Sequence, residues 1–151
     1  MITRTSVHAH RVRLPDCDFV ESSKNLYLHF SSKHSNSAIS FDYDTCITIY
    51  LDKQRRYFVL QEKEEGTLFI LNNWVELHGN LINLICIGES ATIGFSYDLQ
   101  VNNRVSSVIL KSFTEFVPAW VEHSPLKRFL VVPSDFAGSC GMLTVELCIR
   151  R

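Results

Sequence analysis

The chain lacks the local signatures that most often assign an enzymatic function. Its five cysteines are dispersed and include no Cys-x-x-Cys pair, so neither a zinc ribbon nor a thioredoxin motif is present. It has no glycine-rich phosphate loop and no Gly-x-Ser-x-Gly motif, and no carboxylate pair is spaced for acid–base catalysis. These absences favour a protein that is not an enzyme and that uses no cofactor.

Net charge and long apolar runs are also scarce. A formal net charge of −1 argues against nucleic acid or an anionic membrane surface as a partner. No apolar run approaches the ~18 residues that a membrane span needs, and the first residues lack the apolar core of a signal peptide. Together with the odd number of cysteines, this predicts an intracellular protein, cytoplasmic or nuclear, with reduced thiols and no membrane partner.

What the chain does contain is regular alternation of apolar and polar residues. Three long series show it, at 39–51, 91–101 and 143–149. A period of two places one face of a strand on a core and the other in solvent, which is typical of antiparallel sheet. The sequence therefore predicts an all-β fold: one antiparallel, jelly-roll-like β-sandwich domain over residues 1–151, with about ten strands and at most one short helix.

Several local features refine this prediction. The segment 37–51 is long for one strand, which predicts a bend near Asp44 and Thr45. The segment 81–87 is almost continuously apolar, as expected of a central strand covered on both faces. Residues 112–115 have the form of a capping box, which predicts a short helix that ends near Pro118. Hairpin turns are predicted at Asn72-Asn73, Gly79-Asn80 and Asn102-Asn103.

One motif suggests catalysis. Gly138-Ser139-Cys140-Gly141 resembles the nucleophile loop of viral chymotrypsin-like cysteine proteases, in which backbone N–H groups beside the thiol form an oxyanion hole. The resemblance implies that Cys140 is the nucleophile of a small cysteine hydrolase, with His29 or His34 as base and Asp42 or Asp44 as acid. The match spans four residues and only one strand follows it. We therefore favour a glycine-rich turn that holds a small cysteine.

A second motif suggests a metal. His8-Ala9-His10 would point two imidazoles to the same face of a strand, as in the cupin metal site. No later His or Glu completes a ligand set in a matching pattern. We therefore favour two histidines on a solvated strand face, and no metal.

The remaining candidates are surfaces for binding. Arg55 and Arg56 on a predicted hairpin suggest a basic patch, although nearby acidic residues favour an ordinary solvated surface. The aromatic residues Phe113, Phe116 and Trp120 lie in an irregular segment, where they either cap the core or anchor a partner.

These features predict a non-enzymatic protein–protein interaction or assembly module, such as a scaffold or adaptor subunit. A cysteine hydrolase using Cys140 and a sandwich that binds an apolar ligand between its sheets remain alternatives. The last strand, 143–149, has few charged residues to protect an edge. It is therefore either a central strand or covered by another chain, and the second case predicts a homo-oligomer or an obligate protein partner.

Overall fold

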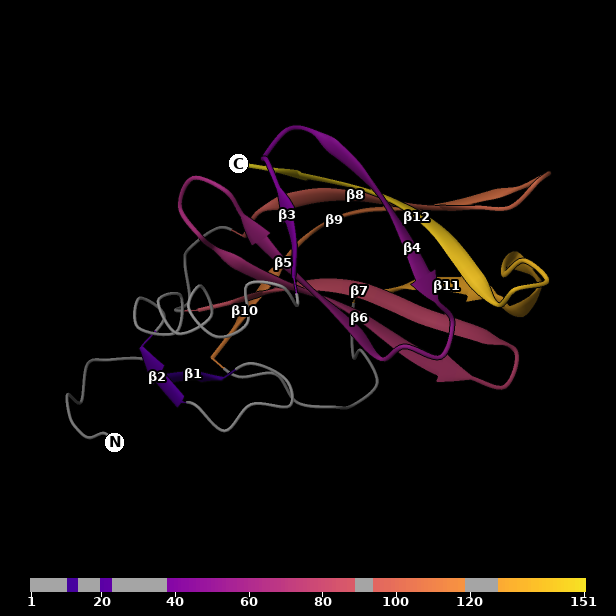
Figure 1. Cartoon of the computed structure of the whole chain (residues 1–151), viewed down its shortest axis with the longest axis horizontal. Helices are drawn as coiled ribbons and strands as arrows, with labels where there is room; N and C mark the ends of the chain where they lie inside the picture. The colour runs from indigo at the N-terminus through magenta and orange to yellow at the C-terminus, as the bar shows by residue number, and fades with distance from the viewer. Residues whose placement is uncertain (1–10, 14–19, 23–37, 89–93, 119–127) are drawn as a thin grey trace.

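Two β-sheets lie face to face in the computed structural model, which describes residues 11–13, 20–22, 38–88, 94–118 and 128–151 (Figure 1). One sheet has the strand order β4 (Cys46–Asp52), β12 (Met142–Arg150), β8 (Ser96–Asn102), β9 (Ser107–Phe113). The other has the order β10 (Glu115–Val117), β7 (Gly79–Ile87), β6 (Leu68–Glu76), β5 (Tyr57–Glu62), β3 (Ala38–Phe41), and β11 (Leu130–Pro133) also pairs with β7. A separate pair joins β1 (Arg11–Arg13) to β2 (Val20–Ser22).

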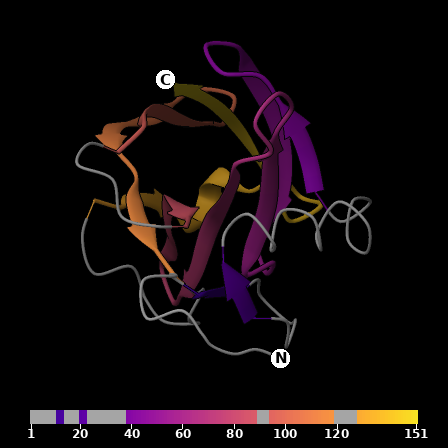
Figure 2. The ribbon, with the colours of Figure 1, turned by 90° about the vertical axis from the view of Figure 1, so that its left-hand side faces the viewer.

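This arrangement confirms the prediction of an all-β, mainly antiparallel sandwich. The helical element among the described residues is a single 3-10 turn, η2 (Ser134–Phe136). Two short ladders, β3 with β5 and β10 with β7, are parallel. Figure 2, viewed from the side that carries the C-terminus, shows the two sheets as separate layers.

The core lies between the sheets and follows the predicted alternation. Buried residues of β8 and β12 alternate with polar residues that face outward, as Leu99 and Val145 illustrate. They pack against buried residues of the six-stranded sheet, including Phe69 and Leu84. Because eight of the nine residues of β7 are buried, the prediction of a strand covered on both faces is also confirmed.

The predicted bend in the segment 37–51 is confirmed, and it is a full turn. Residues 43–44 form the turn, and Asp44 has a φ of 64°. The segment therefore becomes two strands in different sheets, because β3 pairs with β5 whereas β4 pairs with β12. A left-handed backbone at Asp44 is tolerable because aspartate adopts it more readily than most residues do.

Two of the three predicted hairpin turns are misplaced. β6 runs without a break through Asn72 and Asn73, because the Asn73 side chain is buried and satisfies carbonyl groups of a neighbouring turn. The turn that follows is at residues 77–78, so Gly79 and Asn80 begin β7. Gly79 is needed for close approach, since a Cβ there would lie 2.2 Å from the carbonyl oxygen of Val132 on β11. The hairpin after Asn102 is confirmed.

The predicted helix after residue 112 is wrong. Thr114 does not cap a helix: its backbone N–H donates to the carbonyl oxygen of Phe95 (2.8 Å), and its hydroxyl accepts from the N–H of Phe95 (3.1 Å). Residues 115–117 then continue as β10 and pair with β7. The segment thus carries the chain from one sheet to the other.

The C-terminal strand β12 lies in the interior of its sheet. It pairs with β4 along one side and with β8 along the other. Both of its edges are therefore satisfied within the chain, and the lack of edge charges on it no longer argues for a second chain.

Candidate functional site

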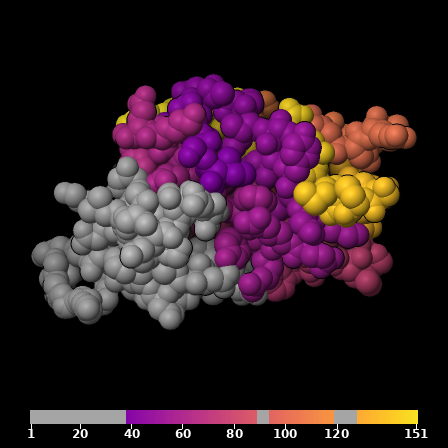
Figure 3. Space-filling view, viewed as in Figure 1, coloured from indigo at the N-terminus to yellow at the C-terminus, as the bar shows by residue number. Residues whose placement is uncertain are grey.

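A groove of about 1260 Å³ opens at one end of the sandwich, which we call the groove end. The registers explain why distant segments meet there. Met142 pairs with Asp52 at the end of β4, and Thr144 pairs with Asn102 at the end of β8. The β8–β9 turn and the segment that leads into β12, residues 134–141, therefore project together, as Figures 1 and 3 show on the right.

The groove has mainly apolar walls and a mixed rim. Tyr50 on β4 and Val105 in the β8–β9 turn contribute exposed apolar surface, with 65% and 89% of each residue accessible. Arg104 and Asp135 place one charge of each sign on the rim. The other lining residues are Asn102, Asn103, Phe136, Ala137, Gly138, Ser139, Cys140, Met142 and Thr144.

Short backbone contacts hold one wall of the groove in place. The Ser134 N–H donates to the carbonyl oxygen of His78 (2.9 Å), and the Gly138 N–H donates to that of Met142 (3.1 Å). Phe136 is buried against the core, which anchors the 3-10 turn. Gly141 has a φ of 78°, a conformation that glycine adopts without strain. The wall is thus held by backbone and core contacts within the chain.

Two buried amides fix the β4–β5 turn at the same end. The Asn73 side chain donates to the carbonyl oxygens of Lys53 (3.1 Å) and Arg55 (2.7 Å). The Asn80 side chain donates to Lys53 O (2.9 Å) and to the Asn73 amide oxygen (2.7 Å). Because buried carbonyl groups without donors are costly, these amides make the turn a rigid neighbour of the groove.

A smaller depression of about 310 Å³ lies beside the β6–β7 turn. Leu77 in that turn is 87% exposed, and Val131 on β11 is 56% exposed. Seven large hydrophobic residues are exposed in the described part of the chain, and five of them, Tyr50, Val75, Leu77, Val105 and Val131, lie at the groove end. Exposed apolar side chains gathered in one region are typical of a contact surface.

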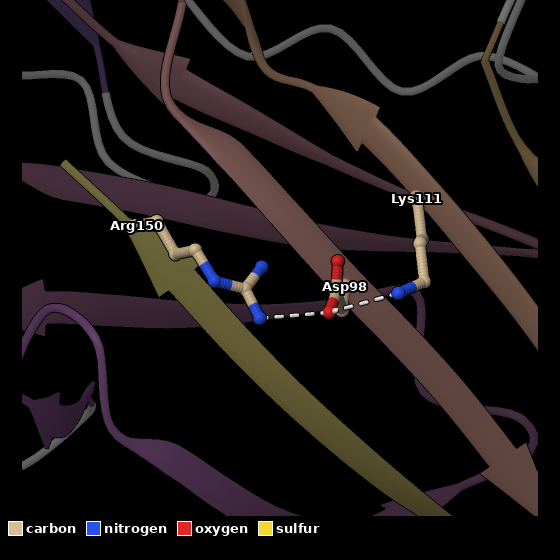
Figure 4. Close-up of polar contacts among 3 residues, drawn as sticks. All are labelled: Asp98, Lys111 and Arg150. Atoms are coloured by element: carbon tan, nitrogen blue, oxygen red, sulfur yellow. Dashed lines mark hydrogen bonds and ion pairs between the residues drawn. The ribbon is translucent and has the colours of Figure 1, made fainter.

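A charged cluster occupies the outer face of the four-stranded sheet. Asp98 on β8 receives a hydrogen bond from Arg150 on β12 at 2.8 Å, and the Lys111 ammonium on β9 lies 3.7 Å away (Figure 4). The hydrogen bond from Arg150 lowers the pKa of Asp98 below its usual value, so this carboxylate is ionised at neutral pH. The outer face of this sheet is therefore charged toward the end where β12 finishes.

The catalytic candidates that the structure describes, Cys140 with Asp42 and Asp44, are not brought together. Cys140 is exposed in the loop before β12. The Asp44 N–H donates to the carbonyl oxygen of Ile149, near the far end of β12. That end lies roughly 25 Å along the strand from the loop that holds Cys140. Asp42 is at that far end too, where it pairs with Lys63 at 3.4 Å. His29 and His34 lie outside the described residues.

The candidate metal ligands His8 and His10 also lie outside the described residues. Within the described part of the chain, no group of three or more His, Cys, Asp or Glu side chains is placed to hold a metal ion. In the same residues, no helix has both the length and the apolar character needed to cross a membrane.

The predicted binding residues lie in different places. Phe113 is 52% exposed at the end of β9, whereas Phe116 is half-buried and its ring lies 6.0 Å from that of Phe95. Arg55 is exposed at the groove end, with its guanidinium 3.7 Å from the centre of the Phe58 ring, and Arg56 is exposed beside it. Trp120 lies outside the described residues.

Sequence reasoning missed the groove itself. Its walls come from segments that are far apart in the chain, and the motif at Gly138-Ser139-Cys140, which lines one of them, was considered only as a possible nucleophile loop. A usable signal was present in the strand ends: the confirmed Asn102-Asn103 turn and the loop before the last strand must meet if those two strands pair. The pairing of β8 with β12 was the missing information.

Comparison with known proteins gives a consistent set of relatives, although no family model matches the chain. The chain is 31% identical over 136 residues to the E3 ubiquitin-protein ligase SINA-like 10 of Arabidopsis thaliana. The matched region covers 89% of this chain and 39% of the ligase. SINA-like 2 and SINA-like 1 of the same plant are 23% and 25% identical and are covered to 45% and 38% of their lengths. The chain spans less than half the length of these curated relatives. It is therefore similar, along most of its own length, to one part of SINA-like E3 ubiquitin-protein ligases.

Proposed function

We propose that this chain is a protein-binding module of the kind found in SINA-like E3 ubiquitin-protein ligases, and that it holds a protein at its groove end. The observation that carries the proposal is the groove between the β8–β9 turn and residues 134–141, with the exposed Tyr50 and Val105 on its walls. The similarity to ligases, whose named activity joins ubiquitin to proteins, supports a protein as the bound molecule.

The shape of the groove favours an extended segment of the partner. The groove is open rather than enclosed, and it lies beside β4, the edge strand of the four-stranded sheet. Its walls offer apolar contacts, while the Asn103 side-chain NH2 group and the Thr144 hydroxyl offer hydrogen bonds to a peptide backbone. The Asn102 amide is bonded within the chain, to Glu146, Gln100 and Ser107. Apolar anchors with a few polar groups around them are the usual composition of a peptide-binding site.

The alternative of an apolar ligand between the sheets has less support. The space between the sheets is occupied by buried side chains from both layers, including Phe69, Leu99 and Val145. The larger cavity described above lies at the end of the sandwich and not between its layers.

A library of random extended peptides displayed on phage would test the proposal. The wild-type chain should enrich peptides that the Val105→Asp variant no longer binds, because the new carboxylate would stand on the apolar wall of the groove. Phe113→Ala is the matched control, since Phe113 is also an exposed apolar residue but lies away from the groove. Enriched peptides that bind Val105→Asp normally and lose binding to Phe113→Ala would move the site to β9.

Scaffolding, self-association and an intracellular location stay predictions. Sedimentation of the purified chain at micromolar concentration would test self-association, because a homo-oligomer would sediment as a species heavier than the 17.4 kDa monomer.

A further inference from the structure

Two cysteines face each other on neighbouring strands at the polar face of the four-stranded sheet. Cys46 begins β4, and Cys148 lies near the end of β12, directly opposite it in the antiparallel register. Both are free thiols. The sequence places them 102 positions apart, so only the fold brings them together.

The hydrogen-bond pattern puts this pair at a site where the strands approach closely. The Lys53 N–H donates to the carbonyl oxygen of Gly141 at 3.0 Å, which continues the β4–β12 register by one step. Pairs of an antiparallel ladder alternate between hydrogen-bonded and non-hydrogen-bonded. The pair of Lys53 with Gly141 is hydrogen-bonded, and Cys46 is an odd number of residues from Lys53. The pair of Cys46 with Cys148 is therefore non-hydrogen-bonded.

The other side of β12 gives the same answer. The Asn103 N–H donates to the carbonyl oxygen of Ser106 (2.9 Å), so the backbone groups of Asn103 point toward β9. Successive residues of a strand point their backbone groups to opposite sides. Asp98 is an odd number of residues from Asn103, so its backbone groups point toward β12. Cys148 is opposite Asp98, so the backbone N–H and carbonyl groups of Cys148 form their hydrogen bonds with β8 and not with β4. Non-hydrogen-bonded pairs have Cα atoms about 4.5 Å apart, which lies within the range that a disulfide spans.

The two thiols differ in their access to solvent. Cys46 is exposed, whereas Cys148 is 5% exposed. Burial, with a hydrogen bond to the Cys46 thiol, raises the pKa of Cys148 to about 11. An oxidant in solution therefore meets Cys46 first, and Cys148 stands next to the product of that reaction.

We propose that Cys46 and Cys148 form a reversible cross-strand disulfide when the chain meets a hydroperoxide. The Cys46 thiolate attacks one peroxide oxygen, the O–O bond breaks, and the sulfur becomes a sulfenic acid while the other oxygen leaves as hydroxide or alkoxide. The Cys148 sulfur then attacks the sulfenic sulfur, its proton and the sulfenic hydroxyl leave as water, and the S–S bond forms. The peroxide is reduced by two electrons and the two thiols are oxidised by two.

The bond would tie an edge strand to the centre of its sheet. Among the described strands, β4 is the first of the four-stranded order and pairs with β12 alone. The same strand carries Tyr50 into the groove. A cross-link that closes so long a stretch of chain restricts the unfolded state strongly, so the oxidised protein should resist heat better than the reduced one.

The test is to treat the folded, reduced chain with hydrogen peroxide, alkylate the remaining thiols and map the peptides by mass spectrometry. The expected product is about 2 Da lighter before alkylation and links the Cys46 peptide to the Cys148 peptide. Its melting temperature should rise by about 5–15 °C and return to the starting value with dithiothreitol.

Variants separate the roles of the thiols. With Cys148→Ser, dimedone should trap a sulfenic acid at Cys46, and with Cys46→Ser, Cys148 should remain a thiol. Cys140→Ser is the matched control, because Cys140 is exposed but has no partner strand, and the cross-link should form unchanged in it. Independent alkylation of Cys46 and Cys148 after peroxide, or equal cross-linking of the chain unfolded in urea, would overturn the proposal.

Discussion

The two ends of the sandwich use their side chains in opposite ways. At the end that carries the β12 terminus, which we call the aromatic end, the rings of Phe41, Tyr43, Phe69 and Phe95 contact one another inside the fold. The outside of that end carries ion pairs, Lys63 with Asp42 and Arg151 with Glu65. At the groove end the order is reversed: amides are buried and apolar side chains are exposed.

This difference separates stability from binding. Buried aromatic surface stabilises the fold, whereas exposed apolar surface contributes little until a partner covers it. Burial also raises the pKa of Tyr43 to about 12, so the aromatic end keeps this phenol neutral in any ordinary solution. Five of the seven exposed large hydrophobic residues of the described chain lie at the groove end, so most of the apolar surface left for a partner is there. Substitutions at the two ends should therefore differ in their effects on stability and on binding.

Truncating the aromatic end should be most damaging. Phe69→Ala removes a fully buried ring that contacts three others, and it should cost about 3–5 kcal/mol of unfolding free energy. Phe113→Ala, at an exposed phenylalanine, should change the free energy by less than about 0.5 kcal/mol. Urea unfolding followed by fluorescence measures both. Similar losses from the two variants would mean that the ring cluster does not hold this end together.

The buried amides should come next. Asn73→Ala leaves the carbonyl oxygen of Arg55 without its side-chain donor, and Lys53 keeps only the donor from Asn80. The variant also removes the amide oxygen that accepts from Asn80, and the combined loss should cost about 1–3 kcal/mol. Gln54→Ala in the same turn is the control, because that side chain is exposed. Hydrogen exchange should show faster opening of the β4–β5 turn in Asn73→Ala only. Unchanged stability would show that water replaces these hydrogen bonds at no cost.

The charged cluster should contribute less, and its contribution should depend on pH. The pKa of Asp98 is lowered in the folded state, chiefly by the hydrogen bond from Arg150, so folding favours the ionised form. Its contribution is therefore complete above the unfolded pKa of about 3.9 and is lost as the pH falls through the folded value. Asp98→Asn should cost about 1 kcal/mol or less at pH 7, because the pair is partly exposed.

Stability measured at low pH tests the contribution of Asp98. The stability difference between wild type and Asp98→Asn should shrink toward zero as the pH drops from about 4 to 2, measured by thermal unfolding at each pH. Glu64→Gln, at an exposed residue of the β5–β6 turn, is a charge-matched control. A difference that grows in acid would have the wrong sign for a lowered pKa.

Changes in the groove should barely affect stability. Val105 is 89% exposed in a turn, so Val105→Ala and Val105→Asp should each alter the unfolding free energy by less than about 0.5 kcal/mol. A large loss from either variant would show that Val105 is a structural residue and would remove it from the binding surface.

Particular residues show how much of the fold could be predicted from the sequence. The alternation of apolar and polar residues predicted correctly which faces of β8 and β12 point into the core. Leu99 and Val145, which belong to the apolar series of these strands, are both buried. Turn chemistry was less informative. Asn73 has the composition of a turn but is a buried strand residue, since its amide serves carbonyl groups 18 and 20 positions away in the chain. Contacts of that range cannot be read from local sequence.

The same limit applies to the candidate site. The exposed phenylalanine at position 113 was identified from residue type alone, but the groove depends on which strand ends meet. Arg55 was identified as basic, yet its guanidinium rests on Phe58 and donates to the carbonyl oxygen of Tyr57 at 3.0 Å. Its charge is thus partly committed to the fold, a fact that only the packing shows.

The most direct test of the account places a photo-crosslinking amino acid at position 105 in one protein and at position 64 in another. Each is exposed to an extract of the native source, irradiated, and its adducts are identified by mass spectrometry. A protein should cross-link at position 105, and a peptide selected by the wild-type groove should suppress this adduct. No competing peptide should alter adducts at position 64. Adducts that form at position 64 alone, or that form at position 105 and resist the peptide, would contradict the claim that the groove end is the binding surface.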